Sequence, residues 1–227
     1  MTRRGRVQAG LGLLLALAPR VSSAQVGVSG TATASLFVHQ VDVGYGVEES
    51  TGLVFGAEGA VAWRSRLVLA LRAGGGSLST QAMGAENRKV GEIGVRASIA
   101  AARWLALLGG ATSRVYSTAI ARQRWTTVDL GAEARLDFAT IPVRAVLRGG
   151  VLPVVSVHGL PGPDVALCGA AGLEYRGGPV TGAAFYELER YDFPDAGAGR
   201  RLEQVSRLSF RVTVQRSARR VTSGERR

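Results

Sequence analysis

TVDLGAEARLDF, residues 127–138, alternates between apolar and polar side chains at every step. Successive side chains of a β-strand point to opposite faces of a sheet, whereas a helix repeats its faces about every 3.6 residues. The stretch therefore predicts a strand with one apolar and one charged face. The apolar face holds Val128, Leu130, Ala132, Ala134, Leu136 and Phe138, and the polar face holds Thr127, Asp129, Gly131, Glu133, Arg135 and Asp137.

The same period of two recurs along the chain from residue 27 to residue 215. Repeated short segments of this kind, separated by turn residues, are typical of all-β proteins. We predict ten strands, at residues 27–40, 53–64, 66–78, 89–101, 104–116, 124–138, 142–154, 164–176, 179–191 and 205–215. Eight strands is the alternative, because 104–116 and 142–154 alternate less cleanly than the others.

The predicted connections alternate between long and short. The long ones fall at residues 41–52, 79–88, 117–123, 155–163 and 192–204, and the short ones at 65, 102–103, 139–141 and 177–178. Transmembrane barrels of outer membranes have tight turns on the periplasmic side and longer loops outside, and an even number of strands brings both termini to the periplasm. The spacing therefore predicts a closed antiparallel up-and-down transmembrane β-barrel.

Charged side chains gather on the polar faces of the predicted strands. We expect them to form a lumen charge network of Glu58, Arg72, Glu92, Arg96, Asp129, Glu133, Arg135, Asp137, Arg144, Arg148, Glu174, Glu187, Glu189, Arg207 and Arg211. Acids and arginines are nearly equal in number, so we expect them to pair, because an unpaired buried charge is costly. Glu133 and Asp137 should face Arg144 and Arg148 across a hairpin.

The opposite faces carry almost no charge and hold much alanine and glycine beside valine and leucine. Lipid chains fill the space beside small residues, whereas the core of a soluble β-sandwich calls for larger ones. The composition thus favours a barrel in lipid over an exported sandwich, which stays as the alternative fold. Closure into a barrel also pairs every strand edge, as a hydrocarbon environment requires.

The two ends of the chain have a different composition from its body. Residues 1–24 resemble a signal peptide, with Arg3, Arg4 and Arg6 before a short apolar run and small residues before Gln25. Residues 216–227 form a basic tail that we expect to be disordered in the periplasm. These ends account for most of the formal net charge of +11. The nearly balanced body, residues 25–215, therefore argues against nucleic-acid binding.

The pattern over residues 25–215 resembles the general class of small bacterial outer-membrane β-barrel proteins. That resemblance implies the bacterial outer membrane as the location, the lipid bilayer and the barrel-assembly machinery as partners, and a monomer. The sequence departs from the class at its last strand. Members usually end this strand with an aromatic residue, whereas here its aromatic is Phe210, followed by Gln215 and the basic tail.

The strand number also resembles that of the omptin outer-membrane proteases, which use acidic residues and a His–Asp pair at the outer rim. Here His39 precedes Asp42, and His158 precedes Asp164, but no longer motif surrounds either pair. We therefore predict no catalytic residue, cofactor or metal site, and expect His39 to be a polar lumen residue and His158 a loop residue. Cys168 is the single cysteine, so no internal disulfide forms, and we expect it to be a small lumen residue.

The function expected from these features is a structural or surface-interaction role, or slow passage of small solutes through a narrow, charged and mostly closed lumen. Ten strands leave little free bore once arginines fill it. The runner-up is a hydrolase at the outer rim that uses His39 and Asp42.

Overall fold

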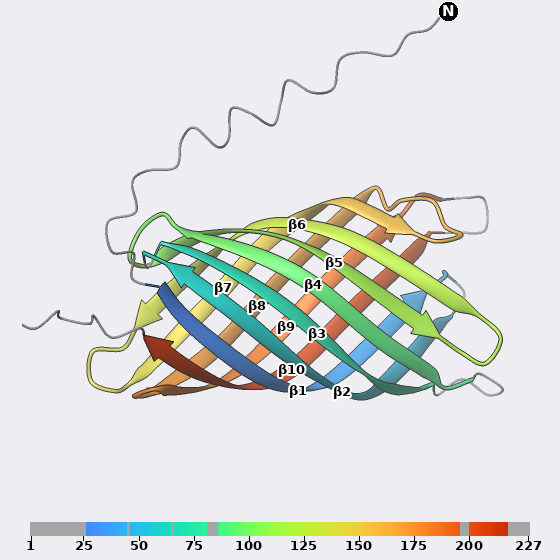
Figure 1. Ribbon diagram of the computed structural model, residues 1–227. Helices are drawn as coiled ribbons and strands as arrows, with labels where there is room; N and C mark the ends of the chain where they lie inside the picture. The colour runs from blue at the N-terminus through green and yellow to red at the C-terminus, as the bar shows by residue number, and fades with distance from the viewer. Residues whose placement is uncertain (1–25, 45, 65, 81–85, 196–199, 218–227) are drawn as a thin grey trace, which may run out of the picture.

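The computed structural model describes residues 26–44, 46–64, 66–80, 86–195 and 200–217. Within them, ten antiparallel strands close into a barrel (Figure 1), in which each strand pairs with its chain neighbours and the first pairs with the last. The strands are β1 (Val26–Asp42), β2 (Val47–Trp63), β3 (Leu67–Thr80), β4 (Arg88–Ala100), β5 (Leu105–Ser117), β6 (Arg122–Asp137), β7 (Val143–Val157), β8 (Val165–Gly177), β9 (Val180–Phe193) and β10 (Arg201–Ser217). The predicted closed barrel of ten strands is confirmed, and the alternatives of eight strands and of a sandwich are wrong.

The described ends of the chain lie at the same end of the barrel, where Gly27 of β1 pairs with Ser217 of β10 (Figure 1). The tight turn at Gly178 is also at this end, and its φ of 69° suits glycine because a residue without Cβ adopts this conformation without strain. Short turns and both termini mark the periplasmic side of such barrels. We call this end the periplasmic end and the opposite one the outer end. The predicted signal peptide and most of the predicted tail lie outside the described residues, and β10 includes Arg216.

The strands run further at the outer end than the sequence predicts. β2 begins at Val47 rather than near residue 53, and β10 begins at Arg201 rather than near residue 205. The predicted long loop at 41–52 is therefore wrong, because β1 and β2 are joined by residues 43–46. Glu48 and Glu49 interrupt the apolar alternation, yet backbone pairing with Val41 and Gln40 continues through them. Register is carried by main-chain hydrogen bonds, which need no apolar face.

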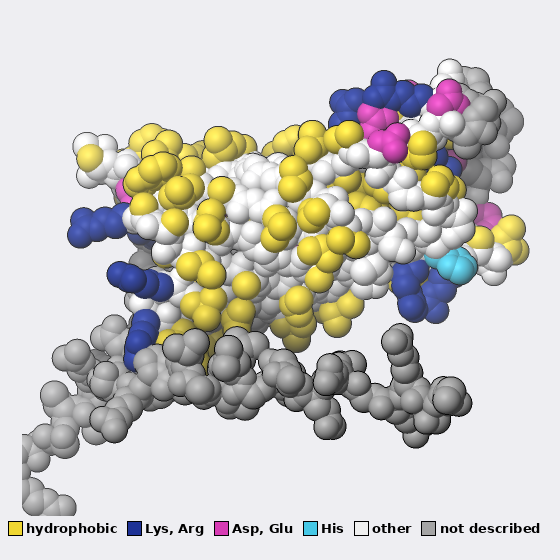
Figure 2. Space-filling view, turned by 90° about the horizontal axis from the view of Figure 1, so that it is seen from above, with side chains coloured by type: hydrophobic (Ala, Val, Ile, Leu, Met, Phe, Trp, Pro, Cys, Tyr) yellow, Lys and Arg dark blue, Asp and Glu magenta, His cyan; other side chains and the backbone are white. Residues whose placement is uncertain are grey.

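The outer wall of the barrel is apolar. In Figure 2 hydrophobic side chains cover its side, and charged side chains gather towards its two ends. Large exposed hydrophobics come from every strand, among them Leu53, Leu71, Ile93, Leu107, Leu130, Leu147, Leu173, Tyr186, Leu208 and Phe210. A contiguous band of this kind is what a bilayer covers. No helix long and apolar enough to cross a membrane occurs in the described residues.

The packed core of the molecule lies inside the barrel. On β1, Leu36 is 45% exposed on the wall while its neighbour Phe37 is 1% exposed in the lumen. Close backbone approach helps to curve the sheet: a Cβ added at Gly74 of β3 would lie 2.8 Å from the carbonyl oxygen of Phe55 on β2. Glycine at this point lets the two strands come together.

Candidate functional site in the barrel lumen

The outer part of the lumen is filled by apolar side chains that we call the aromatic plug. It consists of the buried residues Phe37, Leu78, Val90, Tyr116, Trp125, Leu152, Val157, Ala166, Tyr191, Phe193 and Val205. The rings pack edge to face, with centroids 5.0 Å apart for Trp125 and Tyr191 and 6.1 Å apart for Trp125 and Phe193. Such offset contacts are the preferred geometry for aromatic pairs. The plug joins side chains from most of the strands across the bore.

A buried histidine lies against this plug. His39 is 3% exposed, its ring stacks on Tyr116 at 4.8 Å, and its Nε2 is 2.9 Å from an oxygen of Glu203. Glu203 is fully buried and also accepts hydrogen bonds from Arg201. The hypothesis that pairs His39 with Asp42 is wrong, because the Asp42 carboxylate instead accepts a hydrogen bond from the backbone N–H of Gly44. The two residues are an odd number of positions apart on β1, so they point to opposite faces.

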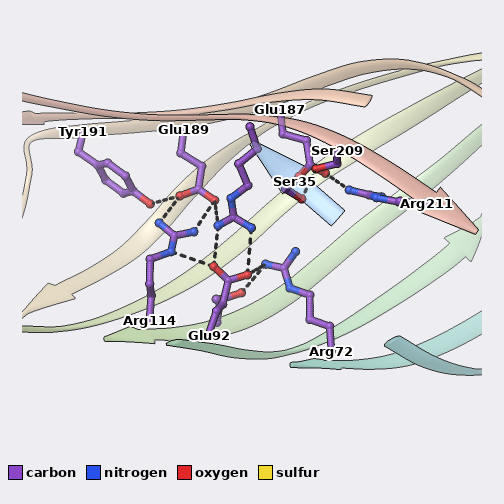
Figure 3. A network of polar contacts seen from close by, with 11 residues as sticks. Ser35, Arg72, Glu92, Arg114, Glu187, Glu189, Tyr191, Ser209 and Arg211 are labelled. Carbon is purple, nitrogen blue, oxygen red and sulfur yellow. Dashed lines mark hydrogen bonds and ion pairs between the residues drawn. The ribbon is translucent and has the colours of Figure 1, made fainter. Parts of the chain in front are cut away.

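A network of ion pairs crosses the middle of the lumen (Figure 3). The Glu92 carboxylate of β4 lies 2.6 Å from Arg207, 2.8 Å from Arg114 and 3.3 Å from Arg72. Arg114 also donates to both oxygens of Glu189, at 2.8 and 2.9 Å. Because β4 and β5 lie across the barrel from β9 and β10, these contacts join opposite walls.

Phe37 lies where the plug meets this network. The guanidinium carbons of Arg207 and Arg114 lie 4.9 and 5.8 Å from the centre of its ring. Tyr191, also in the plug, donates its hydroxyl to Glu189 at 2.8 Å. Arginine stacked on an aromatic face adds a cation–π attraction. The apolar and charged layers are thus packed directly against each other.

Towards the periplasmic end the lumen opens into a polar cavity of about 300 Å³, which we call the vestibule. Its lining runs from Phe37 to Ser29 and Gln215, near the periplasmic ends of β1 and β10. A smaller inner cavity of about 80 Å³ adjoins it and is lined by residues that include Cys168 and Asp129. Arg72, Arg96, Arg148, Glu187 and Arg207 line both cavities and so lie between them.

The structure places the predicted charged residues inside the barrel, but it arranges them unevenly. The vestibule is lined by Glu58, Arg72, Glu92, Arg96, Arg144, Arg148, Glu174, Glu187, Arg207 and Arg211, and the inner cavity adds Asp129 and Glu189. Glu133 pairs with Arg148 and, at 2.5 Å, with Arg135. Asp137 lies near the periplasmic rim, 2.8 Å from Arg144.

Asp129 does not join this β6–β7 ladder. A β-bulge shifts the register between Val128 and Leu130, so Asp129 has no partner directly opposite on β7. A bulge adds an unpaired residue to one strand and redirects the side chain beside it. The sequence alternation continues through the bulge without a sign of it, so its position was not predictable from the pattern.

Sequence reasoning missed the aromatic plug, Arg114 and Glu203. All lie on the lumen faces of their strands. The signal was present in β1, where Phe37 and Val41 share the phase of Ser35 and His39. Apolar residues in the polar phase near the outer ends of strands indicate a closed lumen rather than an irregular strand.

The other residues considered for chemistry lie apart from one another. His158 is exposed in the turn after β7, and its backbone N–H donates to the carbonyl oxygen of Arg124. Cys168 is half-buried and packs against the plug. Across the described ranges, no three His, Cys, Asp or Glu side chains are grouped so that they could hold a metal ion.

Solved structures with a similar fold include the outer membrane protease OmpT from Escherichia coli. It has a TM-score of 0.52 and 8% identity, over 88% of this chain and 99% of that chain. The translocator domain of the autotransporter NalP from Neisseria meningitidis has a TM-score of 0.46 and 16% identity, over 83% of this chain and 88% of that chain. No protein-family model and no curated protein matches the sequence.

At such low identity the similarity to OmpT concerns the fold alone. It agrees with the closed strand order and with the apolar wall described above. A closed sheet with an apolar exterior and a packed, charged interior is arranged for lipid, not for water. The chain is therefore a small β-barrel protein of the bacterial outer membrane, embedded in the lipid bilayer.

Proposed function

We propose that the protein is a non-conducting barrel with a structural or surface-interaction role at its outer rim, and not a channel for solutes. The observation that carries this proposal is the aromatic plug across the outer part of the lumen. Its central members, Phe37, Trp125 and Tyr191, are each at most 2% exposed. An apolar constriction without water is a barrier to ions.

The mid-lumen ion pairs form a second barrier beneath the plug. A path through the bore would have to separate Arg207 from Glu92 or Arg114 from Glu189, because these pairs join opposite walls. Breaking one partner of a buried pair is strongly unfavourable, since a desolvated charge is left without compensation. The narrow-channel alternative therefore has two layers against it.

The length of the strands supports a role at the outer rim. β1, β2 and β10 have 17 residues each, whereas a strand crosses the hydrocarbon in about 9–11. The excess lies at the outer end, where Glu48 pairs with Arg88 and Arg200 pairs with Asp192. A folded, charged rim held above the membrane is a surface suited to contacts outside the cell.

The hydrolase alternative gains no support from the histidine at the rim. His39 and Glu203 are within hydrogen-bond distance, but both are buried in the lumen. A general base must reach the substrate or a water molecule directly, and the plug residues cover this pair. We therefore advance no catalytic function.

Cys168 provides a test of closure because it is the single cysteine and packs against the plug from within the lumen. We expect a membrane-impermeant maleimide added to intact cells to leave Cys168 unlabelled. The double variant Trp125→Ala/Tyr191→Ala should become labelled, because it removes the central rings of the plug.

The matched control moves the thiol to the outer surface. In Ile120→Cys/Cys168→Ala the cysteine lies in the loop after β5, where Ile120 is 89% exposed, and labelling should be immediate. Labelling of Cys168 in the otherwise unchanged protein at the rate of this control would show an open outer end and overturn the proposal.

A further inference from the structure

Arg96 of β4 is the exception among the lumen arginines. Its side chain lines both the vestibule and the inner cavity. Within 4.0 Å of a carboxylate oxygen lie Arg72, Arg114, Arg135, Arg144, Arg148, Arg176, Arg207 and Arg211. Among the described residues no carboxylate or other group forms an ion pair or hydrogen bond with Arg96. A lumen cation without a partner is a feature that calls for a reason.

The charged surroundings of Arg96 make the missing partner more costly. Its strongest charged neighbours are two other arginines, Arg148 and Arg72, ahead of Glu187 and Glu58. Glu187 is itself paired with Arg211. Like charges near one another in a partly dry space repel strongly, since little water screens them. The protein therefore holds a positive centre between its two cavities.

We propose that this junction binds a small oxyanion of the phosphate type, held by Arg96 together with Arg72 and Arg148. The three guanidinium groups come from β3, β4 and β7, so they approach the junction from different walls. A guanidinium offers parallel N–H donors that match the oxygens of such an anion. The inner cavity of about 80 Å³ has room for a group of this size, since one water occupies about 30 Å³ in the liquid.

The route to this site is from the periplasmic end. The vestibule extends from the junction towards Ser29 and Gln215, along hydroxyls such as Thr31 and Thr213, which lie 2.8 Å apart. The aromatic plug separates the junction from the outer end. Anion binding does not depend on the non-conducting role proposed above, because the vestibule and Arg96 lie on the periplasmic side of the plug.

The experiment titrates the refolded full-length mature chain, in non-ionic detergent at low ionic strength, with inorganic phosphate in a calorimeter. We expect saturable binding at one site, and binding at least tenfold weaker in Arg96→Gln. Arg66→Gln is the matched control, because it removes the same charge from an exposed turn outside the lumen. Its affinity should equal that of the unchanged protein. No saturable binding, or equal affinity in Arg96→Gln, would overturn the proposal.

Thermal unfolding separates a binding role of Arg96 from a purely structural one. Without phosphate, Arg96→Gln should unfold at a higher temperature than the unchanged protein, because the repulsion from Arg148 and Arg72 is gone. Phosphate should raise the unfolding temperature of the unchanged protein and leave that of the variant where it was, because a ligand stabilises only a state that binds it. A variant that is less stable without phosphate, with both proteins responding equally to it, would refute the site.

Arg96→Lys provides a check should the glutamine variant fail to fold. Lysine keeps the charge but lacks the forked donors of arginine. Phosphate affinity between those of the unchanged protein and a chain without the cation is expected, and affinity equal to that of the unchanged protein would contradict guanidinium recognition.

Discussion

Replacing Trp125 by alanine probes the aromatic plug directly. Trp125 is 2% exposed and packs edge to face on Tyr191 and Phe193. Truncation of a large buried aromatic costs about 3–5 kcal/mol, of which each ring pair supplies about 0.5–1.5 kcal/mol. Among the described residues the indole Nε1 has no hydrogen-bond partner, so the loss is one of packing and not of a polar contact. We expect the free energy of unfolding to fall by about 3–5 kcal/mol.

The assay follows the fraction of folded barrel against guanidinium concentration, from the mobility of unboiled protein on gels and from far-UV circular dichroism. The matched control is Trp104→Ala, since Trp104 is 56% exposed at the periplasmic rim, and its loss should be below about 1 kcal/mol. Trp125→Phe keeps a ring in the plug and should lose far less than the alanine variant. Equal destabilisation by Trp125→Ala and Trp104→Ala would refute the claim that the packed core lies inside the lumen.

Three further predictions concern charge, depth in the membrane and turn geometry. Glu92→Gln removes the carboxylate that three arginines share and should cost about 3–5 kcal/mol in unfolding free energy, whereas Glu48→Gln, in a half-exposed rim pair, should cost below about 1 kcal/mol; equal losses would contradict the mid-lumen network. Ile93→Arg, in the middle of the lipid-facing wall, should cost about 2–4 kcal/mol, and Val47→Arg at the outer rim about 0–1 kcal/mol, as measured by unfolding in lipid vesicles; the reverse order would misplace the membrane. Gly178→Val should destabilise by about 1–3 kcal/mol, because its φ is 69°; no change in the unfolding midpoint would contradict that turn.

The sequence predicts the fold because a period of two specifies which face each side chain occupies. The alternation in residues 127–138 places Glu133 and Arg135 in the lumen, and the same logic places Arg207 and Arg211 there. Hairpin partners follow from chain order, so the contact of Glu133 with Arg148 was within reach of sequence reasoning. These are local consequences of strand geometry.

Contacts across the lumen are a different matter. Arg207 and Glu92 are 115 residues apart in the chain, and the stagger of all the strands between them decides whether they meet. The same stagger brings Phe37 of β1 level with Tyr116 of β5 and Trp125 level with Tyr191 of β9. Alternation contains no information on this stagger, so neither the plug nor the pairing of His39 with Glu203 was predicted.

The outer ends of the strands show the other limit of pattern reasoning. Lipid imposes an apolar face only over its own thickness, and above it the strands continue on backbone pairing alone. Glu48 and Glu49 of β2 lie in this part, where polar residues interrupt the alternation but not the hydrogen bonds. A pattern built on hydrophobicity therefore ends before the strand does.

The central claim is that this outer-membrane barrel has a closed lumen, and single-channel recording in planar lipid bilayers tests it most directly. The protein is first shown to be folded by a heat-dependent shift in gel mobility. Because the aromatic plug and the ion pairs beneath it span the bore, we predict a flat current trace at moderate voltage. Reproducible conductance steps from the folded, unchanged protein would contradict the account.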